Sequence, residues 1–338
     1  MLLIKVLVAS ALSTLIVLGM APSAPAAPTC PDPQTRAVCG DRVIAHPAGS
    51  TSFIQYGTEY EPAIRAIEAI APQVIAVKPI GAWIGRPKAA SAGGLDIYVV
   101  RLTDESASGP KRQVAISLSV HGNESAGREG GLRYIEDIAH WWTQNDRDRV
   151  LYAGDKGVPL ADVMKATEVY ICICNVDGWA AGDLPKPAFT RGNANRADLN
   201  RDYPTIGWTK QDQLQQPETK AWVRLVESLP NLTTATDIHG ELTSATDSFS
   251  DIMFPAGQWD PVRQAQELQF AQDMVRTVER KFVEEGVTAE TLLQATGDER
   301  VIKPASFATA YDIIGYDDSG FMGDWFVSQG AVELDVEN

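Results

Sequence analysis

The stretch that decides the fold runs from residue 113 to residue 142 and reads QVAISLSVHGNESAGREGGLRYIEDIAHWW. Residues 113–120 are mostly apolar, which is typical of a buried strand. Residues 125–142 carry an apolar stripe at helical spacing, formed by Leu132, Ile135, Ile138 and Trp142. The polar turn His121-Gly-Asn-Glu124 lies between them. A strand, a turn and a helix in this order predict an α/β fold.

The same alternation continues along the chain. Further strand-like runs are residues 74–80, 95–102, 168–174, 233–238 and 331–337, and helical patterns cover 61–71, 217–229 and a segment opening at Asp260-Pro261. In this last helix, Leu268, Val275, Val278 and Phe282 are expected to face inward. We find no internal repeat and no linker after residue 60. The sequence therefore predicts one α/β domain over residues 59–338.

Composition narrows the range of functions. The 338 residues are 44% hydrophobic and 22% charged, which are globular values. The formal net charge is −15. An acidic chain without basic runs argues against nucleic-acid binding, because phosphates must be neutralised by Lys and Arg. It also argues against adhesion to anionic lipid.

The N-terminus has the pattern of an export signal. Lys5 precedes an uncharged apolar run from Val6 to Met20, and small residues of the A-x-A type follow up to Ala27. We therefore expect a signal peptide at 1–27, an irregular segment at 28–58, and a secreted protein (extracellular or periplasmic) with no membrane association after cleavage. The apolar run is short for a membrane span.

The four cysteines form two close pairs. Cys30 and Cys39 could form a small disulfide loop in an exported protein, and their redox state is left open. Cys172 and Cys174 are two residues apart in a strand-like run, so they point to the same face. We interpret this second pair as buried thiols.

Polar side chains follow several of these strands. His121, Asn175 and His239 each come directly after a strand pattern, and the carboxyl ends of strands are where sites gather in open α/β sheets. An imidazole at His121 and a carboxylate at Glu124 suit zinc, and His239 is the natural third ligand. Asp237, two residues earlier, is a candidate to orient His239. A lone H-x-x-E occurs often by chance, so it is weak by itself.

The segment Val120-His-Gly-Asn-Glu124 resembles the H-x-x-E motif of the zinc carboxypeptidase (carboxypeptidase A-like) family. Further similar segments follow in the family's order: Asn175-Val-Asp-Gly-Trp179, Asp198-Leu-Asn-Arg-Asp-Tyr-Pro204, Pro217-Glu-Thr-Lys-Ala221, Asp237-Ile-His239, and Ala310-Tyr311 with Gly315 and Asp324-Trp325. The resemblance spans about residues 60–338. It implies a three-layer αβα sandwich with a central mixed, mostly parallel twisted sheet. It also implies one Zn²⁺ ion held by His121, Glu124 and His239.

The resemblance further implies roles for residues outside the metal set. Asn200 and Arg201 would bind the C-terminal carboxylate of a peptide, since an Arg fork matches a carboxylate bidentately. Tyr311 would close over the substrate. Arg191 would polarise the scissile carbonyl, with Arg196 as the competing candidate.

A glutamate on the last strand would act as the general base, and both Glu333 and Glu337 are candidates. They lie on the same side of the strand. The spacing from Trp325 and Gly330 fits the family's glutamate at Glu337, whereas Glu333 comes too early. We therefore predict Glu337.

The predicted function is that of a secreted, monomeric zinc metallocarboxypeptidase acting on peptides with a free C-terminal carboxylate. Two alternatives remain open: a zinc amidase or peptidase of the same fold that acts on cell-wall peptides or small acylated amino acids, and an inactive binding protein on the same scaffold. Gly323 stands where the family usually reads the substrate side chain, so the side-chain preference is undetermined. Because the chain stops just after Glu337, we expect domain 59–338 to lack the family's C-terminal helix.

Overall fold

The computed structural model describes residues 42–44, 53–183, 188–205, 213–240, 247–255, 260–315 and 320–337. The expected signal peptide and the pair Cys30 and Cys39 lie outside the described residues, as does most of the segment 28–58. Cys172 and Cys174 are free and buried, as predicted.

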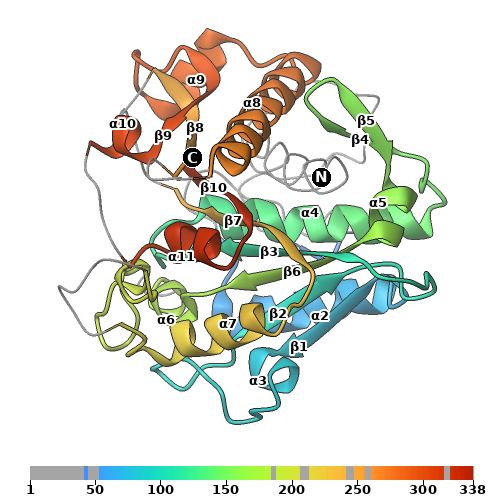
Figure 1. Cartoon of the computed structure of the whole chain (residues 1–338), viewed down its shortest axis with the longest axis vertical. Helices are drawn as coiled ribbons and strands as arrows, with labels where there is room; N and C mark the ends of the chain where they lie inside the picture. Colours follow the sequence, from blue (N-terminus) through green and yellow to red (C-terminus); the bar gives the residue numbers. More distant parts are fainter. Residues whose placement is uncertain are drawn as a thin grey trace.

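An eight-stranded sheet forms the centre of the molecule (Figure 1), in the order β1-β2-β6-β3-β7-β10-β8-β9. Parallel pairing joins β6, β3, β7 and β10, and also β8 with β9. The pairings β1–β2, β2–β6 and β10–β8 are antiparallel. The strands are β1 (Ile75–Pro79), β2 (Tyr98–Leu102), β3 (Arg112–Leu118), β6 (Thr167–Ile173), β7 (Leu232–Ile238), β8 (Ser248–Phe254), β9 (Lys303–Thr309) and β10 (Val332–Glu337). The mixed sheet is the one that the resemblance implied.

Two hydrophobic clusters separate the helices into two layers. One cluster joins the sheet to α2 (Glu61–Ile70), α4 (Ala126–Thr143), α5 (Leu160–Ala166) and α8 (Pro261–Glu284). The other joins its opposite face to α3 (Ile80–Trp83), α7 (Pro217–Glu227) and α11 (Met322–Ser328). Side chains of β3 divide between the clusters, with Ile116 in the first and Ala115 in the second, because successive residues of a strand face opposite sides. The three-layer αβα prediction is confirmed.

Several shorter elements also lie in the described part of the chain. They are the π-helical turn η2 (Tyr56–Tyr60), the hairpin of β4 (Val150–Ala153) and β5 (Lys156–Pro159), α6 (Val176–Ala180), the 3₁₀ turn η3 (Leu199–Arg201), α9 (Ala289–Thr296) and α10 (Ala310–Ile314). Helices α8 and α9 lie with β8 and β9 at one end of the molecule (Figure 1). No helix within the described part of the chain combines the length and apolar character needed to cross a bilayer.

The buried face of α8 differs from the prediction at one position. Val275, Val278 and Phe282 are buried, but Leu268 is 37% exposed. Its neighbour Glu267 is fully buried instead. The stripe that packs on the sheet at this end of the helix is set by Glu267, Phe270 and Ala271, at the i, i+3, i+4 spacing of one helix face.

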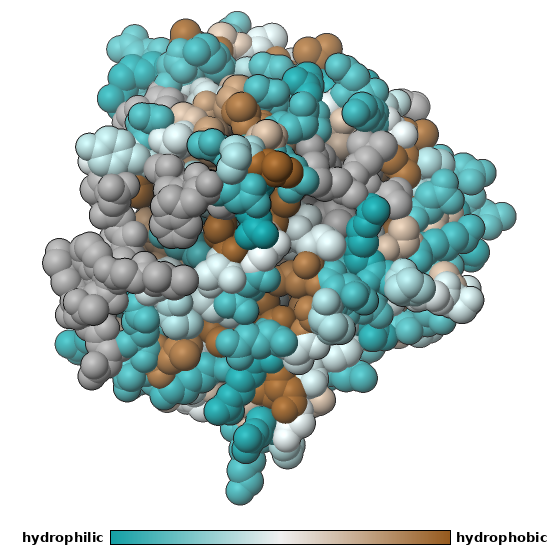
Figure 2. Space-filling model, viewed as in Figure 1, coloured by the Kyte–Doolittle hydropathy of each residue, from teal (hydrophilic) through white to brown (hydrophobic). Residues whose placement is uncertain are grey.

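The surface is largely hydrophilic on the face seen in Figure 2, where hydrophobic residues form small separate patches. Scattered exposed apolar residues are normal for folded proteins. Several carboxyl groups are nevertheless buried, among them Asp177, Glu218 and Glu333.

Candidate metal centre

The loop after β3 is held in one conformation by a buried arginine. Arg128, on the first turn of α4, is fully buried and donates from Nη1 to the carbonyl oxygens of Gly122 (2.9 Å) and Glu124 (3.0 Å). The loop also packs tightly on the turn after β6, since a Cβ at Gly122 would lie 2.4 Å from the backbone of Gly178. Glycine is therefore required at position 122, and the side chains of His121 and Glu124 are fixed in direction.

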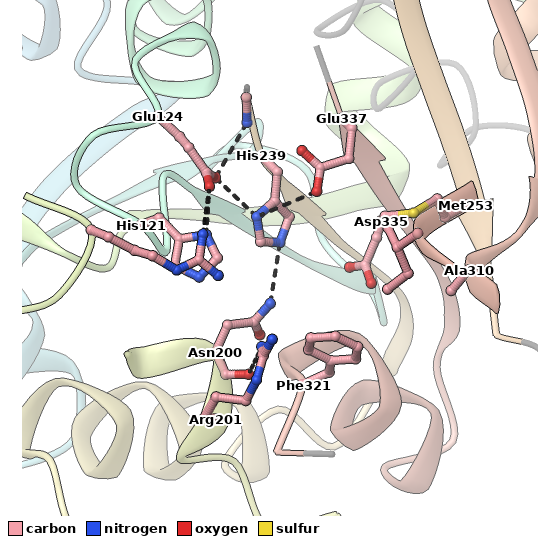
Figure 3. A pocket seen from close by; sticks show the side chains of 13 residues that line it. His121, Glu124, Asn200, Arg201, His239, Met253, Ala310, Phe321, Asp335 and Glu337 are labelled. Atoms are coloured by element: carbon pink, nitrogen blue, oxygen red, sulfur yellow. Dashed lines mark hydrogen bonds and ion pairs between the residues drawn. The ribbon is translucent and has the colours of Figure 1, made fainter. Parts of the chain in front are cut away.

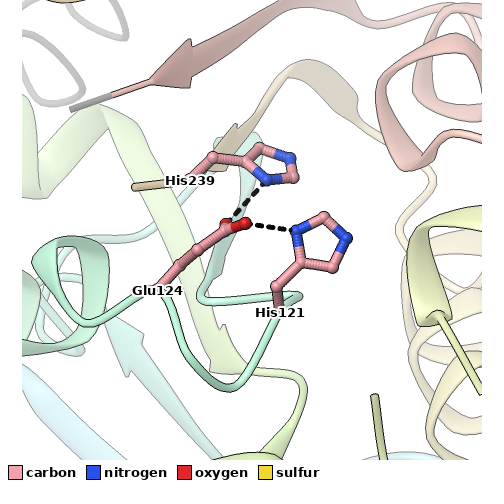
Figure 4. Close-up of side chains that lie close together, drawn as sticks. All are labelled: His121, Glu124 and His239. Carbon is pink, nitrogen blue, oxygen red and sulfur yellow. Dashed lines mark hydrogen bonds and ion pairs between the residues drawn. The ribbon is translucent and has the colours of Figure 1, made fainter. Parts of the chain in front are cut away.

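His121, Glu124 and His239 converge at the carboxyl ends of β3 and β7 (Figure 4). Glu124 Oε1 lies 2.6 Å from His121 Nδ1, and its Oε2 lies 2.9 Å from His239 Nδ1. The ligand atoms of the three residues all lie within 4.8 Å of one another, and all three side chains are buried. The sequence thus predicted the three residues that meet here.

Carboxylates on the far side of each imidazole select the nitrogen that faces the centre. His239 Nε2 lies 2.9 Å from Asp237 Oδ2, and His121 Nε2 lies 3.0 Å from Asp198 Oδ1. Asp198 Oδ1 can accept from the His121 Nε2–H, whereas Asp237 faces His239 Nε2 as a charge contact. With each Nε2 turned toward a carboxylate, the Nδ1 atoms of both rings face the centre, where a metal would bind. Two imidazoles and a carboxylate are a donor set that zinc prefers, so the residues present fit the ion that the resemblance implied.

Electrostatics also favour a cation at this point. Burial raises the pKa of Glu124, but the facing histidines His239 and His121 outweigh burial and lower it to about 2. Burial lowers the pKa of His239, but Asp237, Glu337 and Glu124 outweigh burial and raise it well above its ordinary value. The carboxylates around the centre therefore stabilise positive charge.

Asp198 is a site residue whose contact with His121 the sequence did not predict. It belongs to the quoted Asp198–Pro204 motif, and the motif was the available signal. Its Oδ2 also accepts from Arg191 Nε at 2.9 Å. Replacing Asp198 by Asn weakens the acceptor for the His121 Nε2–H without removing volume. We expect Asp198→Asn to lower zinc affinity by roughly 10–100-fold, measured by chelator competition. An unchanged dissociation constant would show that His121 needs no such partner.

A pocket of about 230 Å³ opens beside the three ligands (Figure 3). Its lining includes four other predicted site residues: Arg191, Asn200, Arg201 and Glu337. Asn200 is fixed by Met322 N–H, which donates to its Oδ1 at 2.8 Å. The guanidinium of Arg201 lies 4.6 Å over the Phe321 ring and donates to the Asn200 carbonyl at 2.9 Å. The pocket therefore combines a candidate metal site with a cationic wall.

The two candidate arginines differ in whether they line the pocket. Arg191 lines the pocket and reaches Glu124 Oε1 at 3.4 Å. Arg196 does not line it, and its backbone adopts the left-handed conformation of a tight turn (φ 62°). Tyr311 is 50% exposed and is not part of the lining, although Ala310 and Ile314 of the same short helix are. Its predicted role as a closing residue requires its side chain to move inward.

The two candidate bases on β10 lie at different depths. Glu337 lines the pocket, and its Oε1 is 3.9 Å from His239 Nδ1. Glu333 is 1% exposed and does not line the pocket. Between them, Asp335 does line it, which the sequence did not predict. Burial raises the pKa of Glu337 and of Asp335 to about 7, against the opposing effect of His239.

The loop that carries Arg191 and Asp198 is anchored by buried carboxyl groups. Asp177 Oδ2 accepts from the backbone N–H groups of Gly93 (2.9 Å) and Ala194 (3.1 Å). Glu218, at the start of α7, accepts from Ala92 N–H at 2.8 Å and from Asn193 Nδ2 at 3.1 Å. Glu218 is 2% exposed. The loop conformation therefore depends on groups outside the pocket.

The stability of the contacts that Glu218 makes with Ala92 and Asn193 is expected to depend on pH. Burial, with Asp177 adding to it, raises its pKa from 4.5 to about 7. Because the pKa of Glu218 is higher in the folded protein than in the unfolded chain, its contribution to the free energy of unfolding is fully present below pH 4.5. This contribution is lost as the pH rises through 7. We expect Glu218→Gln to reduce the loss of stability between pH 5 and pH 8 by about 2–3 kcal/mol relative to wild type, measured by urea unfolding. Equal pH slopes in both proteins would contradict the assignment.

Comparison with known proteins agrees with this geometry. The family model described as zinc carboxypeptidase matches residues 63–337. The chain is 29% identical over 159 residues to carboxypeptidase E of Caenorhabditis elegans, covering 40% of this chain and 31% of that protein. It is 31% identical over 159 residues to carboxypeptidase SOL1 of Arabidopsis thaliana, covering 44% of this chain and 27% of that protein. These matches thus span less than a third of either relative.

Solved structures share the fold at low identity. Bovine thrombin-activatable fibrinolysis inhibitor, in complex with tick carboxypeptidase inhibitor, aligns with a TM-score of 0.56 and 16% identity, over 85% of this chain and 86% of that one. Carboxypeptidase A from Helicoverpa armigera aligns with a TM-score of 0.56 and 16% identity, over 84% of this chain and 64% of that one. From the match over residues 63–337, the chain belongs to the zinc carboxypeptidase family of metallopeptidases.

Proposed function

We propose that this protein is a zinc-dependent carboxypeptidase that hydrolyses the C-terminal peptide bond of peptides. One observation carries the proposal: the same pocket is lined by the ligands His121, Glu124 and His239 and by the carboxylate-binding candidates Asn200 and Arg201. An exopeptidase needs both features at a fixed separation, because it must recognise the chain end while it acts on the adjoining bond.

One Zn²⁺ ion would be held by the two Nδ1 atoms and the Glu124 carboxylate. When bound, zinc supplies Lewis acidity, which polarises a carbonyl and lowers the pKa of water. The substrate's terminal carboxylate pairs with the Arg201 guanidinium and accepts from the Asn200 amide. Arg191 donates to the scissile carbonyl oxygen as negative charge develops on it. Tyr311 moves from the rim to cover the bound chain end.

Glu337 moves the proton. Its carboxylate accepts a proton from the attacking water and passes it to the nitrogen of the leaving amino acid. The C–N bond breaks, and the products are a shortened peptide and a free amino acid. The placement of Glu337 at the pocket wall, beside His239, supports this role over Glu333, which is buried behind it.

A pair of matched peptides tests the proposal. The zinc-loaded protein is expected to release the last amino acid from N-acylated peptides with a free carboxylate. It should leave the same peptides intact when the C-terminus is amidated. Equal cleavage of both forms would contradict recognition of the chain end. Failure on every peptide, with release from cell-wall peptides or acylated amino acids, would favour the alternative substrates. No release from any of them would favour a binding protein.

The protein is also proposed to act after export, as a monomer. Lys5, the apolar run from Val6 to Met20 and the small residues up to Ala27 support cleavage near residue 27. N-terminal sequencing of the protein recovered from a secreting host tests this. A mature protein that still begins at Met1 would overturn it.

A further inference from the structure

The segment that leads into α11 is bound to the segment that carries the two carboxylate-binding candidates. Gly320 donates its N–H to Thr205 Oγ1 at 2.8 Å, and its carbonyl oxygen accepts from Tyr203 N–H at 3.1 Å. A Cβ at Gly320 would lie 2.4 Å from the carbonyl oxygen of Arg201. Residues 320–322 are therefore packed closely against residues 199–205, although the two segments are far apart in the sequence.

The next two residues contact the two candidates directly. Met322 N–H donates to Asn200 Oδ1 at 2.8 Å. The Cζ atom of Arg201 lies 4.6 Å from the centroid of the Phe321 ring, so the guanidinium lies over the ring. Figure 3 shows Arg201 and Phe321 next to each other in the lining of the pocket. The reaction proposed above uses Asn200 and Arg201 but gives Phe321 no role.

Phe321 is held by a rigid part of the molecule. It is the residue directly before α11, and its carbonyl oxygen accepts from Trp325 N–H at 3.2 Å. Met322, Trp325 and Phe326 of α11 are buried in the hydrophobic cluster that joins this helix to the sheet. The backbone beneath the Phe321 ring is therefore fixed by the core, as the support of a binding group should be.

An aromatic ring can order a guanidinium without occupying its donors. The cation is attracted to the face of the ring, whereas its N–H groups donate in the guanidinium plane, where a carboxylate binds. A free arginine side chain loses much rotamer entropy when it is fixed. A ring that fixes it beforehand lowers the entropic cost of binding the carboxylate. The hydrogen bond from Arg201 Nη1 to the Asn200 carbonyl, at 2.9 Å, restricts the side chain further.

We propose that Phe321 is a positioning residue for recognition of the chain end: its ring holds the Arg201 guanidinium in the orientation that pairs with the substrate's terminal carboxylate. The inference rests on the proposed function, in which Arg201 receives that carboxylate. Phe321 acts through Arg201 and not by its own contact with the peptide. Its effect is therefore on the terminal carboxylate, whatever side chain the last residue carries.

Peptide binding without turnover tests the inference. In the zinc-loaded Glu337→Gln protein, calorimetry compares an N-acetylated peptide that ends in leucine with the same peptide amidated at its C-terminus. Recovery of the intact peptides shows that binding alone is measured. This parent protein is expected to bind the free-carboxylate form at least about 10-fold more tightly, the range of hydrogen bonds to a charged group. Phe321→Leu is expected to lower this carboxylate-to-amide ratio by roughly 3–10-fold, the range of a partly exposed cation–π contact.

Further variants separate the ring from general packing. Phe321→Met is a second variant without a ring and is expected to match Phe321→Leu. Phe321→Tyr keeps the ring and is expected to keep the ratio of the parent. Phe307→Leu makes the same substitution on β9, where Phe307 is 37% exposed and does not line the pocket, and it is also expected to keep the ratio. Because each ratio is taken within one protein, a general loss of stability does not imitate the effect.

A double-mutant cycle tests whether the ring acts through Arg201. Arg201→Ala is expected to lower the ratio by itself. Adding Phe321→Leu to Arg201→Ala is expected to have no further effect, because the group that the ring positions is already gone. If Phe321→Leu lowered the ratio equally with and without Arg201, the ring would contact the peptide itself and the positioning role would be wrong.

This inference and the proposed function fail in different ways. If the parent protein bound both peptide forms equally, recognition of the chain end would be wrong, and the role of Phe321 would fall with it. If the parent preferred the free carboxylate and that preference survived unchanged in Phe321→Leu and Phe321→Met, recognition of the chain end would stand and only the inference would be wrong.

Discussion

Glu337→Gln is expected to lower kcat by roughly 10²–10⁴-fold, the usual contribution of a positioned general base. The amide keeps the size of the side chain but cannot accept a proton from water. The Glu337 carboxylate lines the pocket 3.9 Å from His239 Nδ1, and it is not one of the three converging ligands. The loss should therefore appear in kcat, with zinc content unchanged by elemental analysis.

Two further variants test whether the loss of turnover is specific to Glu337. Glu290→Gln makes the same substitution at an exposed position of α9 and should leave turnover unchanged. Glu333→Gln tests the competing base on the same strand. If Glu333→Gln abolished turnover while Glu337→Gln retained it, the assignment of the base would be wrong. The structure argues against that outcome, because Glu333 is 1% exposed and does not line the pocket.

The convergence of His121, Glu124 and His239 could be predicted from the sequence for a simple physical reason. The mostly apolar run of β3 and the threonine-rich run of β7 both have a strand pattern, and the two strands are parallel neighbours in the sheet. Parallel neighbours end at the same edge, so the residues that follow them are brought together. His121 and His239 follow these two strands. The strand pattern thus predicted that polar residues gather at this edge, and the ordered family motifs selected the three residues and suggested their chemistry.

Contacts made by irregular loops could not be predicted from the pattern of strands. Asp198 reaches His121 across 77 residues of sequence, through a loop with no periodic pattern. The pocket position of Arg191, rather than Arg196, is likewise set by the loop's anchors at Asp177 and Glu218. Such contacts depend on the path of the backbone, for which hydrophobic periodicity carries no information.

The acidic groups beside Gly323 could not be predicted from the sequence for a related reason. A glycine carries no charge, and its own position says nothing of the side chains that other elements place against it. The three-dimensional structure places Asp335 and Glu333 against that glycine, and these residues come from a different element. Leu268 was predicted to be buried for a similar reason: its heptad spacing to Val275 is correct, but the packed face at that end of α8 passes through Glu267 and Phe270.

His239→Ala is expected to abolish zinc binding and with it all turnover. The substitution removes one of three ligands and leaves Glu124 Oε2 without the nitrogen that faces it at 2.9 Å. Elemental analysis should find about one zinc per wild-type chain and almost none in the variant. Zinc should also raise the unfolding free energy of wild type by about 4 kcal/mol at a thousandfold excess over its dissociation constant, and this increase should vanish.

His140→Ala is the matched control for that loss. His140 is a buried histidine of α4, 7% exposed and 3.6 Å from Glu136, and it is not part of the converging set. Its removal should lower stability through lost packing but should leave both the zinc content and the zinc-dependent increase in stability in place. Because the stabilisation by zinc is measured within each variant, lower stability alone cannot imitate the loss of a ligand. Full zinc occupancy in His239→Ala would contradict the proposed ligand set, since the remaining pair, His121 and Glu124, offers too few donors for a tetrahedral site.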